Sequence, residues 1–178
     1  MVMDTAGDAI AAPWVDDRRR LAARRHGWGG SATVRHNGAM FTHIDHVGIA
    51  VPDLDEALAF YAEKFDLKSV HEEVNEEQGV REAMLAVGDS GSCIQLLAPL
   101  RPDSPIGKFL AKSGPGIQQM AYRVEDIDEV CATLRARGVR LLYEDPKNGT
   151  AGSRVNFIHP KDAGGVLVEL VEPGSQAH

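Results

Sequence analysis

Two pairs of polar residues at nearly equal spacings are the groups of this sequence that could do chemistry together. His46 and Gln95 lie 49 residues apart, and Gln119 and Glu169 lie 50 residues apart. In each pair, the first residue falls in one apolar segment and the second in a later one, and both segments are typical of strands. If the two halves of the chain fold alike, the four side chains can converge on one point. The spacing therefore predicts a polar site shared between the halves.

Glu82 is a candidate general base. The segment 80–87 alternates so that Glu82 shares a face with the apolar residues Met84 and Ala86. Burial on such a face raises the pKa of a carboxyl group toward the range useful for accepting a proton. An exposed glutamate on an edge strand is the alternative, and alternation alone favours it. Arg154 is also ambiguous, because it would either bind an anionic group or be a solvated surface arginine.

A repeat positions the two polar pairs. The segment 45–57 (DHVGIAVPDLDEA) is followed 73 residues later by 118–130 (QQMAYRVEDIDEV) without a gap. Each copy indicates an apolar strand, an aspartate-rich turn and a helix, since apolar residues recur at i, i+3, i+4 and i+7 after the turn. His46 occupies the position of Gln119, and alternation places His46 beside Gly48 on a face of small residues. Such a face leaves room for something other than protein.

Two modules of about seventy residues follow from this repeat. Strand patterns and turn residues place the first module at 40–98 and the second at 117–172. A linker at 99–116 joins them, with proline and glycine at both ends and a short apolar helix around 106–111. Residues 173–178 form a tail.

The first 39 residues have no sustained apolar periodicity and no apolar signal-peptide core. They contain six arginines and four aspartates, and Met40 stands directly before the first predicted strand. We interpret this leader as disordered, or as the product of a mis-assigned start with Met40 as the first residue. An arginine-rich transit peptide is a third interpretation, against which the four aspartates weigh.

Composition is that of an ordinary globular protein. The chain has 178 residues, of which 43% are hydrophobic and 25% are charged, and it has no apolar run near the roughly 18 residues of a membrane helix. Cys93 and Cys131 fall at apolar positions, which predicts buried thiols and a reducing, cytoplasmic location. Residues 40–178 carry a net charge of −9. A surface this acidic argues against nucleic acid as a partner.

The sequence also resembles a known protein superfamily. A βαβββ module used twice, with a polar residue on the first and last strand of each copy, resembles the vicinal oxygen chelate superfamily. Within it, the segments 75–84 (NEEQGVREAM), 138–146 (GVRLLYEDP) and 156–161 (NFIHPK) are similar to the methylmalonyl-CoA epimerase family. The resemblance covers about residues 41 to 172 and includes loops as well as core strands.

The resemblance implies an α+β fold in which the two modules form a concave mixed sheet around a metal site. It implies a divalent metal bound by His46, Gln95, Gln119 and Glu169, with Glu82 as the base. One departure is that the family usually has a histidine pair where this chain has Gln118–Gln119. Two amides, one imidazole and one carboxylate favour Co, Mn or Mg over Zn or Cu.

The expected activity is epimerisation of an acyl-CoA thioester, methylmalonyl-CoA or a close 2-alkylmalonyl-CoA, by a homodimer. The alternatives are a glyoxalase-type isomerase or lyase, which would share the fold, and a metal-free small-molecule binding protein. An oxygen-activating iron enzyme would require two histidines and a carboxylate, whereas His46 is the only histidine at the four positions.

Overall fold

The computed structural model describes residues 39 to 174. Residues 1–38 of the predicted leader and most of the predicted tail therefore lie outside the described residues, as does the choice between a disordered segment, a transit peptide and a start at Met40. Within the described part, none of the helices is long and apolar enough to span a membrane.

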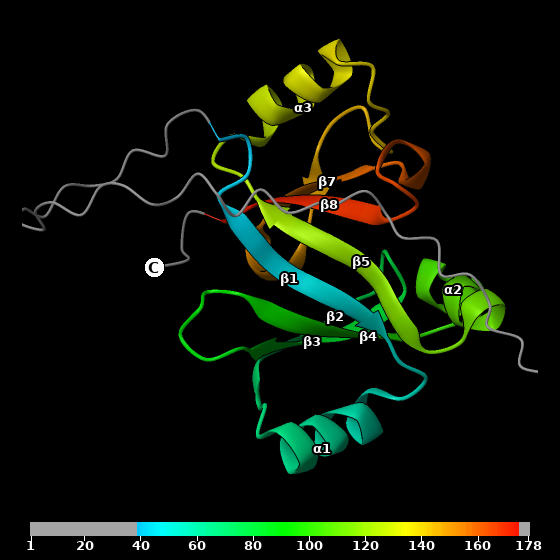
Figure 1. Cartoon of the computed structure of the whole chain (residues 1–178). Helices are drawn as coiled ribbons and strands as arrows, with labels where there is room; N and C mark the ends of the chain where they lie inside the picture. Colours follow the sequence, from blue (N-terminus) through cyan, green and yellow to red (C-terminus); the bar gives the residue numbers. More distant parts are fainter. Residues whose placement is uncertain (1–38, 175–178) are drawn as a thin grey trace, which may run out of the picture. The chain divides into compact units, whose positions relative to one another are not determined.

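Eight strands form one sheet, in the order β2-β3-β4-β1-β5-β8-β7-β6 (Figure 1). The first module comprises β1 (His43–Ala50), α1 (Leu54–Phe65), β2 (Ser69–Asn75), β3 (Val80–Ala86) and β4 (Cys93–Pro99). After α2 (Pro105–Ser113) in the predicted linker, the second module comprises β5 (Gly116–Arg123), α3 (Ile127–Ala136), β6 (Lys147–Asn148), β7 (Arg154–Ile158) and β8 (Leu167–Glu172). Two short 3₁₀ turns, Thr150–Gly152 and Pro160–Asp162, flank β7. The βαβββ order of each module is confirmed.

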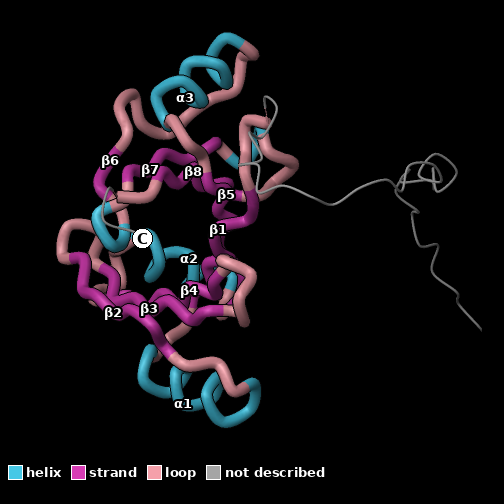
Figure 2. The backbone as a smooth tube through the Cα atoms, turned by 90° about the vertical axis from the view of Figure 1, so that its left-hand side faces the viewer, coloured by secondary structure: helices cyan, strands magenta, loops and turns pink. Residues whose placement is uncertain are grey.

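The two modules meet where β1 pairs antiparallel with β5. On either side of this central pair the pairing is parallel, β1 with β4 and β5 with β8, and the remaining neighbours are antiparallel. The arrangement is symmetric about the β1–β5 pair. Figure 2 shows the strands following an arc, with α1 and α3 outside it. The first and last strands of both modules thus lie side by side at the centre of the concave face.

Each long helix covers the outer face of its own module. Asp53 and Asp126 cap α1 and α3 in the same way, since each side chain accepts a hydrogen bond from a backbone N–H three residues later at 2.9 Å. Under α1 lies a core of Val51, Leu54, Ala83, Leu85, Leu96 and Ala98. Under α3 lies a core of Val124, Ile127, Val130, Cys131, Leu134, Ile158, Val168 and Leu170. The helices α1 and α3 therefore leave the concave face of the sheet uncovered.

Helix α2 occupies one end of the concave side (Figure 2). Ile106 of this helix packs with Ala50, Val80 and Leu97, which all point inward from the first module. The second module differs in one detail from the sequence prediction. The repeat and the strand patterns did not single out Lys147–Asn148, which pairs with β7 as a two-residue edge strand.

Gly48 is required by close packing at the centre of the sheet. A Cβ at this position would lie 2.6 Å from Gln119 Cγ and 3.3 Å from Leu97 Cδ1. We expect Gly48→Ala to lower the free energy of unfolding by about 1–3 kcal/mol, because an extra carbon in a filled core forces its neighbours to move. Thermal or urea denaturation measures this effect. The matched control is Gly116→Ala, where a new Cβ meets nothing within 4 Å, and equal losses in both variants would contradict the explanation.

Candidate active site

Two bulges shape the central strand pair. Ile44 pairs with Tyr122 and His46 with Ala121, so that Asp45 is an extra residue on β1. At the other end of the pair, a second register shift between Gly48 and Ile49 makes Gln118 the extra residue on β5. Each bulge directly precedes a residue of the predicted site, His46 or Gln119. Bulges redirect side chains next to functional sites, and strict alternation did not predict them.

The structure brings the four residues His46, Gln95, Gln119 and Glu169 together. His46 Nε2 lies 3.1 Å from Glu169 Oε2, and Gln119 Nε2 donates to Glu169 Oε2 and, at 3.3 Å, to Gln95 Oε1. Gln119 Nε2 also lies 3.5 Å from His46 Nε2. All four residues are at most 7% exposed. The predicted convergence of the two modules on one polar point is therefore what the fold produces.

Glu82 lies beside this cluster and is buried, with 5% of the residue exposed. Gln95 Nε2 donates to Glu82 Oε2 at 3.0 Å, and Thr150 Oγ1 donates to Glu82 Oε1 at 2.6 Å. Burial raises the pKa of Glu82 to about 7, against the opposing effect of the Thr150 hydrogen bond and with the help of the nearby carboxylates Glu73 and Glu169. The exposed-edge interpretation of Glu82 is thus wrong. A carboxyl group with this pKa can accept and release a proton near neutral pH.

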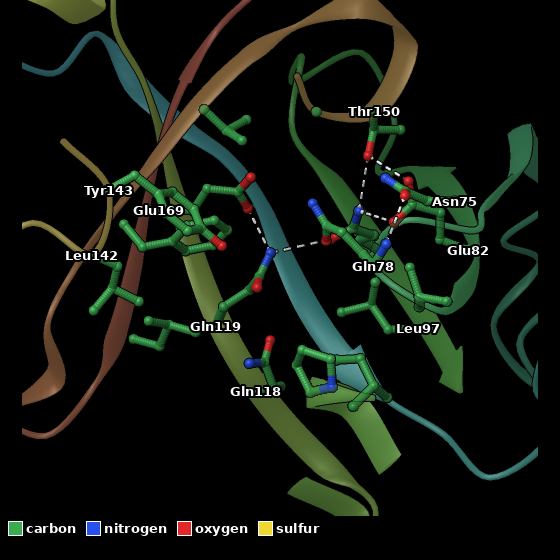
Figure 3. Close-up of a pocket in the computed structure, with 18 residues that line it drawn as sticks. Asn75, Gln78, Glu82, Leu97, Gln118, Gln119, Leu142, Tyr143, Thr150 and Glu169 are labelled. Atoms are coloured by element: carbon green, nitrogen blue, oxygen red, sulfur yellow. Dashed lines mark hydrogen bonds between the residues drawn. The ribbon is translucent and has the colours of Figure 1, made fainter. Parts of the chain in front are cut away.

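Thr150 is a site residue that sequence analysis missed. It lies in the long loop of the second module and reaches across to Glu82 in the first (Figure 3). A loop has no periodicity from which a contact with another element can be predicted.

Arg154, which the sequence left ambiguous, is not part of the cluster, because its guanidinium binds Asp128 at 2.9 Å and Glu172 at 3.3 Å.

Asp45 supports His46 from behind. Its Oδ1 lies 2.9 Å from His46 Nδ1, and its Oδ2 accepts from Arg123 Nε at 2.9 Å. Burial alone would raise the pKa of Asp45, but hydrogen bonds and charges from His46 and Arg123 hold it below its ordinary value. For His46, burial would lower the pKa, but Asp45 and Glu169 raise it to about 9. Asp45 therefore fixes the orientation of the ring and leaves Nε2 facing the cluster.

The donor chemistry of the cluster fits a divalent cation. Among the described residues no three His, Cys, Asp or Glu gather as a metal group, because two of these four donors are glutamines. An imidazole nitrogen with amide and carboxylate oxygens suits Mg, Mn or Co. Gln119 turns Nε2 toward Glu169 here, so that binding a cation would require its amide oxygen in that place.

A cavity of about 250 Å³ opens beside the cluster and Glu82. Figure 3 shows Gln119 and Glu169 turned toward each other at one side of this cavity and Glu82 beside Thr150 at another. Its walls are mostly apolar and come from both modules and from α2; they include Val80, Leu97, Ile106, Leu142, Val155 and Phe157. A cavity that combines apolar walls with convergent polar groups is typical of a small-molecule site.

Comparison with known proteins agrees with the resemblance that the sequence suggested. Residues 45–157 match the family model of the Glyoxalase/Bleomycin resistance protein/Dioxygenase superfamily. The ethylmalonyl-CoA/methylmalonyl-CoA epimerase of Cereibacter sphaeroides is 38% identical over 74% of this chain and 98% of its own length.

Two solved structures are also similar. The methylmalonyl-CoA epimerase of Mycobacterium tuberculosis is 58% identical, with a TM-score of 0.76 over 79% of this chain and 93% of its own. A variant of the Streptomyces coelicolor methylmalonyl-CoA epimerase, in complex with 2-nitronate-propionyl-CoA, is 48% identical, with a TM-score of 0.74 over 76% of this chain and 99% of its own.

Proposed function

This chain belongs to the Glyoxalase/Bleomycin resistance protein/Dioxygenase superfamily and, within it, to the methylmalonyl-CoA epimerases, and we propose that it interconverts the 2R and 2S forms of methylmalonyl-CoA or of a close 2-alkylmalonyl-CoA. The observation that carries this proposal is the position of Glu82. A buried carboxyl group with a pKa of about 7 lies next to a four-donor cluster, at the wall of a cavity that can take the acyl group. These are the groups that removal of a proton next to two carbonyls requires.

His46, Gln95, Gln119 and Glu169 are proposed to hold the divalent metal, with Co, Mn or Mg favoured by their donor types. When bound, the metal supplies Lewis-acid stabilisation of the enolate oxygens. Glu169 and Asp45 place negative charge on either side of His46, which favours a cation at this position. The apolar residues of the cavity wall lower the local dielectric constant, which strengthens these electrostatic interactions.

Glu82 is proposed to remove the α-proton, and inversion requires a second group that returns a proton to the opposite face. Thr150 and Gln95 each donate a hydrogen bond to one of its two oxygens, so that the carboxylate is held in one orientation. Positioned general bases of this kind contribute about 10²- to 10⁴-fold in rate. Because Glu82 comes from the first module and Thr150 from the second, the contact between the two modules holds the catalytic carboxylate in place.

An exchange experiment tests the function. One epimer of methylmalonyl-CoA is incubated with the protein and Co²⁺ or Mn²⁺ in deuterated water, and α-deuterium incorporation is followed by NMR together with loss of optical purity. We expect both to occur and to require protein. Turnover of a glyoxalase substrate without exchange at methylmalonyl-CoA would favour the isomerase or lyase alternative. Tight binding of the thioester without exchange would favour a binding protein.

A homodimer and a cytoplasmic location are further proposals from the sequence.

Asp45 offers a test of the metal site that leaves the four donors in place. We expect Asp45→Asn to weaken metal binding by about 10- to 100-fold, because it removes the carboxylate charge that orients His46. Calorimetric titration with Mn²⁺ or Co²⁺ measures the change. Asp53→Asn is the matched control, since Asp53 is an exposed helix cap where asparagine serves equally well. Equal affinities for both variants would contradict the role of Asp45.

A further inference from the structure

Gln118 is a polar residue of the cavity wall to which the proposed chemistry gives no role. The bulge on β5 gives Gln118 and its neighbour Gln119 access to the same cavity, although successive strand residues normally face opposite sides. Figure 3 shows both side chains at the cavity, with Gln118 farther from Glu169 along the strand. Gln118 therefore lines the same cavity as the cluster residue Gln119.

The carbonyl oxygen of Gln118 is enclosed and unpaired. Within the described part of the chain, Gln118 Oε1 is the one buried side-chain nitrogen or oxygen that has no hydrogen-bond partner. A buried acceptor without a hydrogen-bond partner destabilises the folded protein. Such a group calls for an explanation when the rest of the buried polar atoms are paired.

The symmetry of the fold shows that the bulge position does not by itself leave an acceptor unpaired. Asp45 is the extra residue of the bulge on β1 and precedes His46, as Gln118 precedes Gln119. Both side-chain oxygens of Asp45 have partners, His46 and Arg123. Gln118 has no such partner and borders the cavity instead. Because no protein group is paired with this acceptor, its donor would come from a molecule bound in the cavity.

The chemistry of an acyl-CoA identifies the matching donor. The carboxylate and thioester oxygens near the reacting carbon are acceptors, which cannot pair with a carbonyl oxygen. The donor nearest to the thioester is the amide N–H of the cysteamine unit, two methylenes from the sulfur. We infer that Gln118 Oε1 accepts a hydrogen bond from this amide N–H and so fixes how far the acyl-CoA enters the cavity. The inference rests on the proposed function, which it deepens.

The surroundings of Gln118 favour a specific contact at this point. Pro105, Ile106 and Leu97 line the same cavity, and a hydrogen bond is electrostatically stronger between apolar walls than in water. A fixed entry depth matters for catalysis, because proton transfer requires the α-carbon at a defined distance from Glu82. Gln118 is therefore a positioning residue, one step removed from the reacting atoms.

A substrate pair that differs at one atom tests the contact. Methylmalonyl-CoA is compared with its analogue in which an ester oxygen replaces the cysteamine N–H. We expect the wild-type protein to prefer the amide by about tenfold in kcat/KM, because the ester leaves Oε1 unpaired. In Gln118→Met, which keeps the chain length without an acceptor, this preference should disappear. Gln118→Glu, which restores an acceptor, should restore it.

A matched control separates this contact from a general change of the cavity. Gln78→Met alters another glutamine of the same cavity wall and should keep the wild-type preference for the amide. Metal content measured in every variant should be equal. A Gln118→Met protein that still prefers the amide tenfold overturns the inference while the proposed function stands. A wild-type protein that exchanges no α-proton of methylmalonyl-CoA overturns the proposed function, and the inference with it.

Discussion

Glu82→Gln is expected to lower the rate of α-proton exchange at methylmalonyl-CoA by at least about a hundredfold, while the protein keeps its metal and its fold. Glutamine has nearly the same volume as glutamate and can keep hydrogen bonds to Thr150 and Gln95, but it cannot accept the proton. Glu82→Asp should recover only part of the rate, because a shorter side chain moves the carboxylate beyond the tolerance of proton transfer. Exchange rates by NMR in deuterated water measure both variants.

Glu72→Gln is the matched control for this prediction. Glu72 lies in the same β2–β3 hairpin, but it is exposed and lies near Arg81 on the opposite face of the sheet. It should exchange the α-proton at the wild-type rate. Loss of metal from Glu82→Gln would make Glu82 a support of the metal site. Near-wild-type exchange in that variant, with metal bound, would remove Glu82 from the mechanism.

The repeat explains why so much of the site could be predicted from the sequence. A duplicated strand–turn–helix segment fixes the phase of alternation in both modules, and phase decides which side chains face inward. His46 and Gln119 followed from this register, and their partners Gln95 and Glu169 from the last strand of each module. The fold adds the symmetric β1–β5 contact, which turns equal spacing along the chain into proximity in space.

The residues that sequence reasoning missed depend on contacts between elements. Asp45 and Gln118 owe their roles to bulges, which arise where two strands meet and leave no mark in the periodicity of either strand. Thr150 belongs to a loop whose path is set by the other module. The burial of Glu82 had the same origin, because alternation gives the face of a residue but not what covers that face. Thr150 and Gln95 cover it here.

His46→Ala and Glu169→Ala are each expected to abolish stoichiometric metal binding. His46 supplies the one imidazole nitrogen of the four donors and Glu169 the one carboxylate, while the two amides are neutral and weaker ligands. The two side chains also contact each other, with His46 Nε2 3.1 Å from Glu169 Oε2, so that either change removes a donor and releases its neighbour. Metal content by mass spectrometry and titration with Mn²⁺ or Co²⁺ measure the effect.

Controls on the same elements keep this last prediction sharp. His43→Ala removes an exposed histidine from β1, and Glu125→Ala removes an exposed carboxylate just after β5; both should keep the wild-type metal content. Circular dichroism should show that all four variants are folded, since the site residues lie inside the concave face and outside the two cores under α1 and α3. Stoichiometric metal in His46→Ala or Glu169→Ala would count decisively against the site. Exchange of the α-proton at the wild-type rate by a folded, metal-free variant would show that Glu82 acts without a metal, and the proposed Lewis-acid role would fall while the base remained.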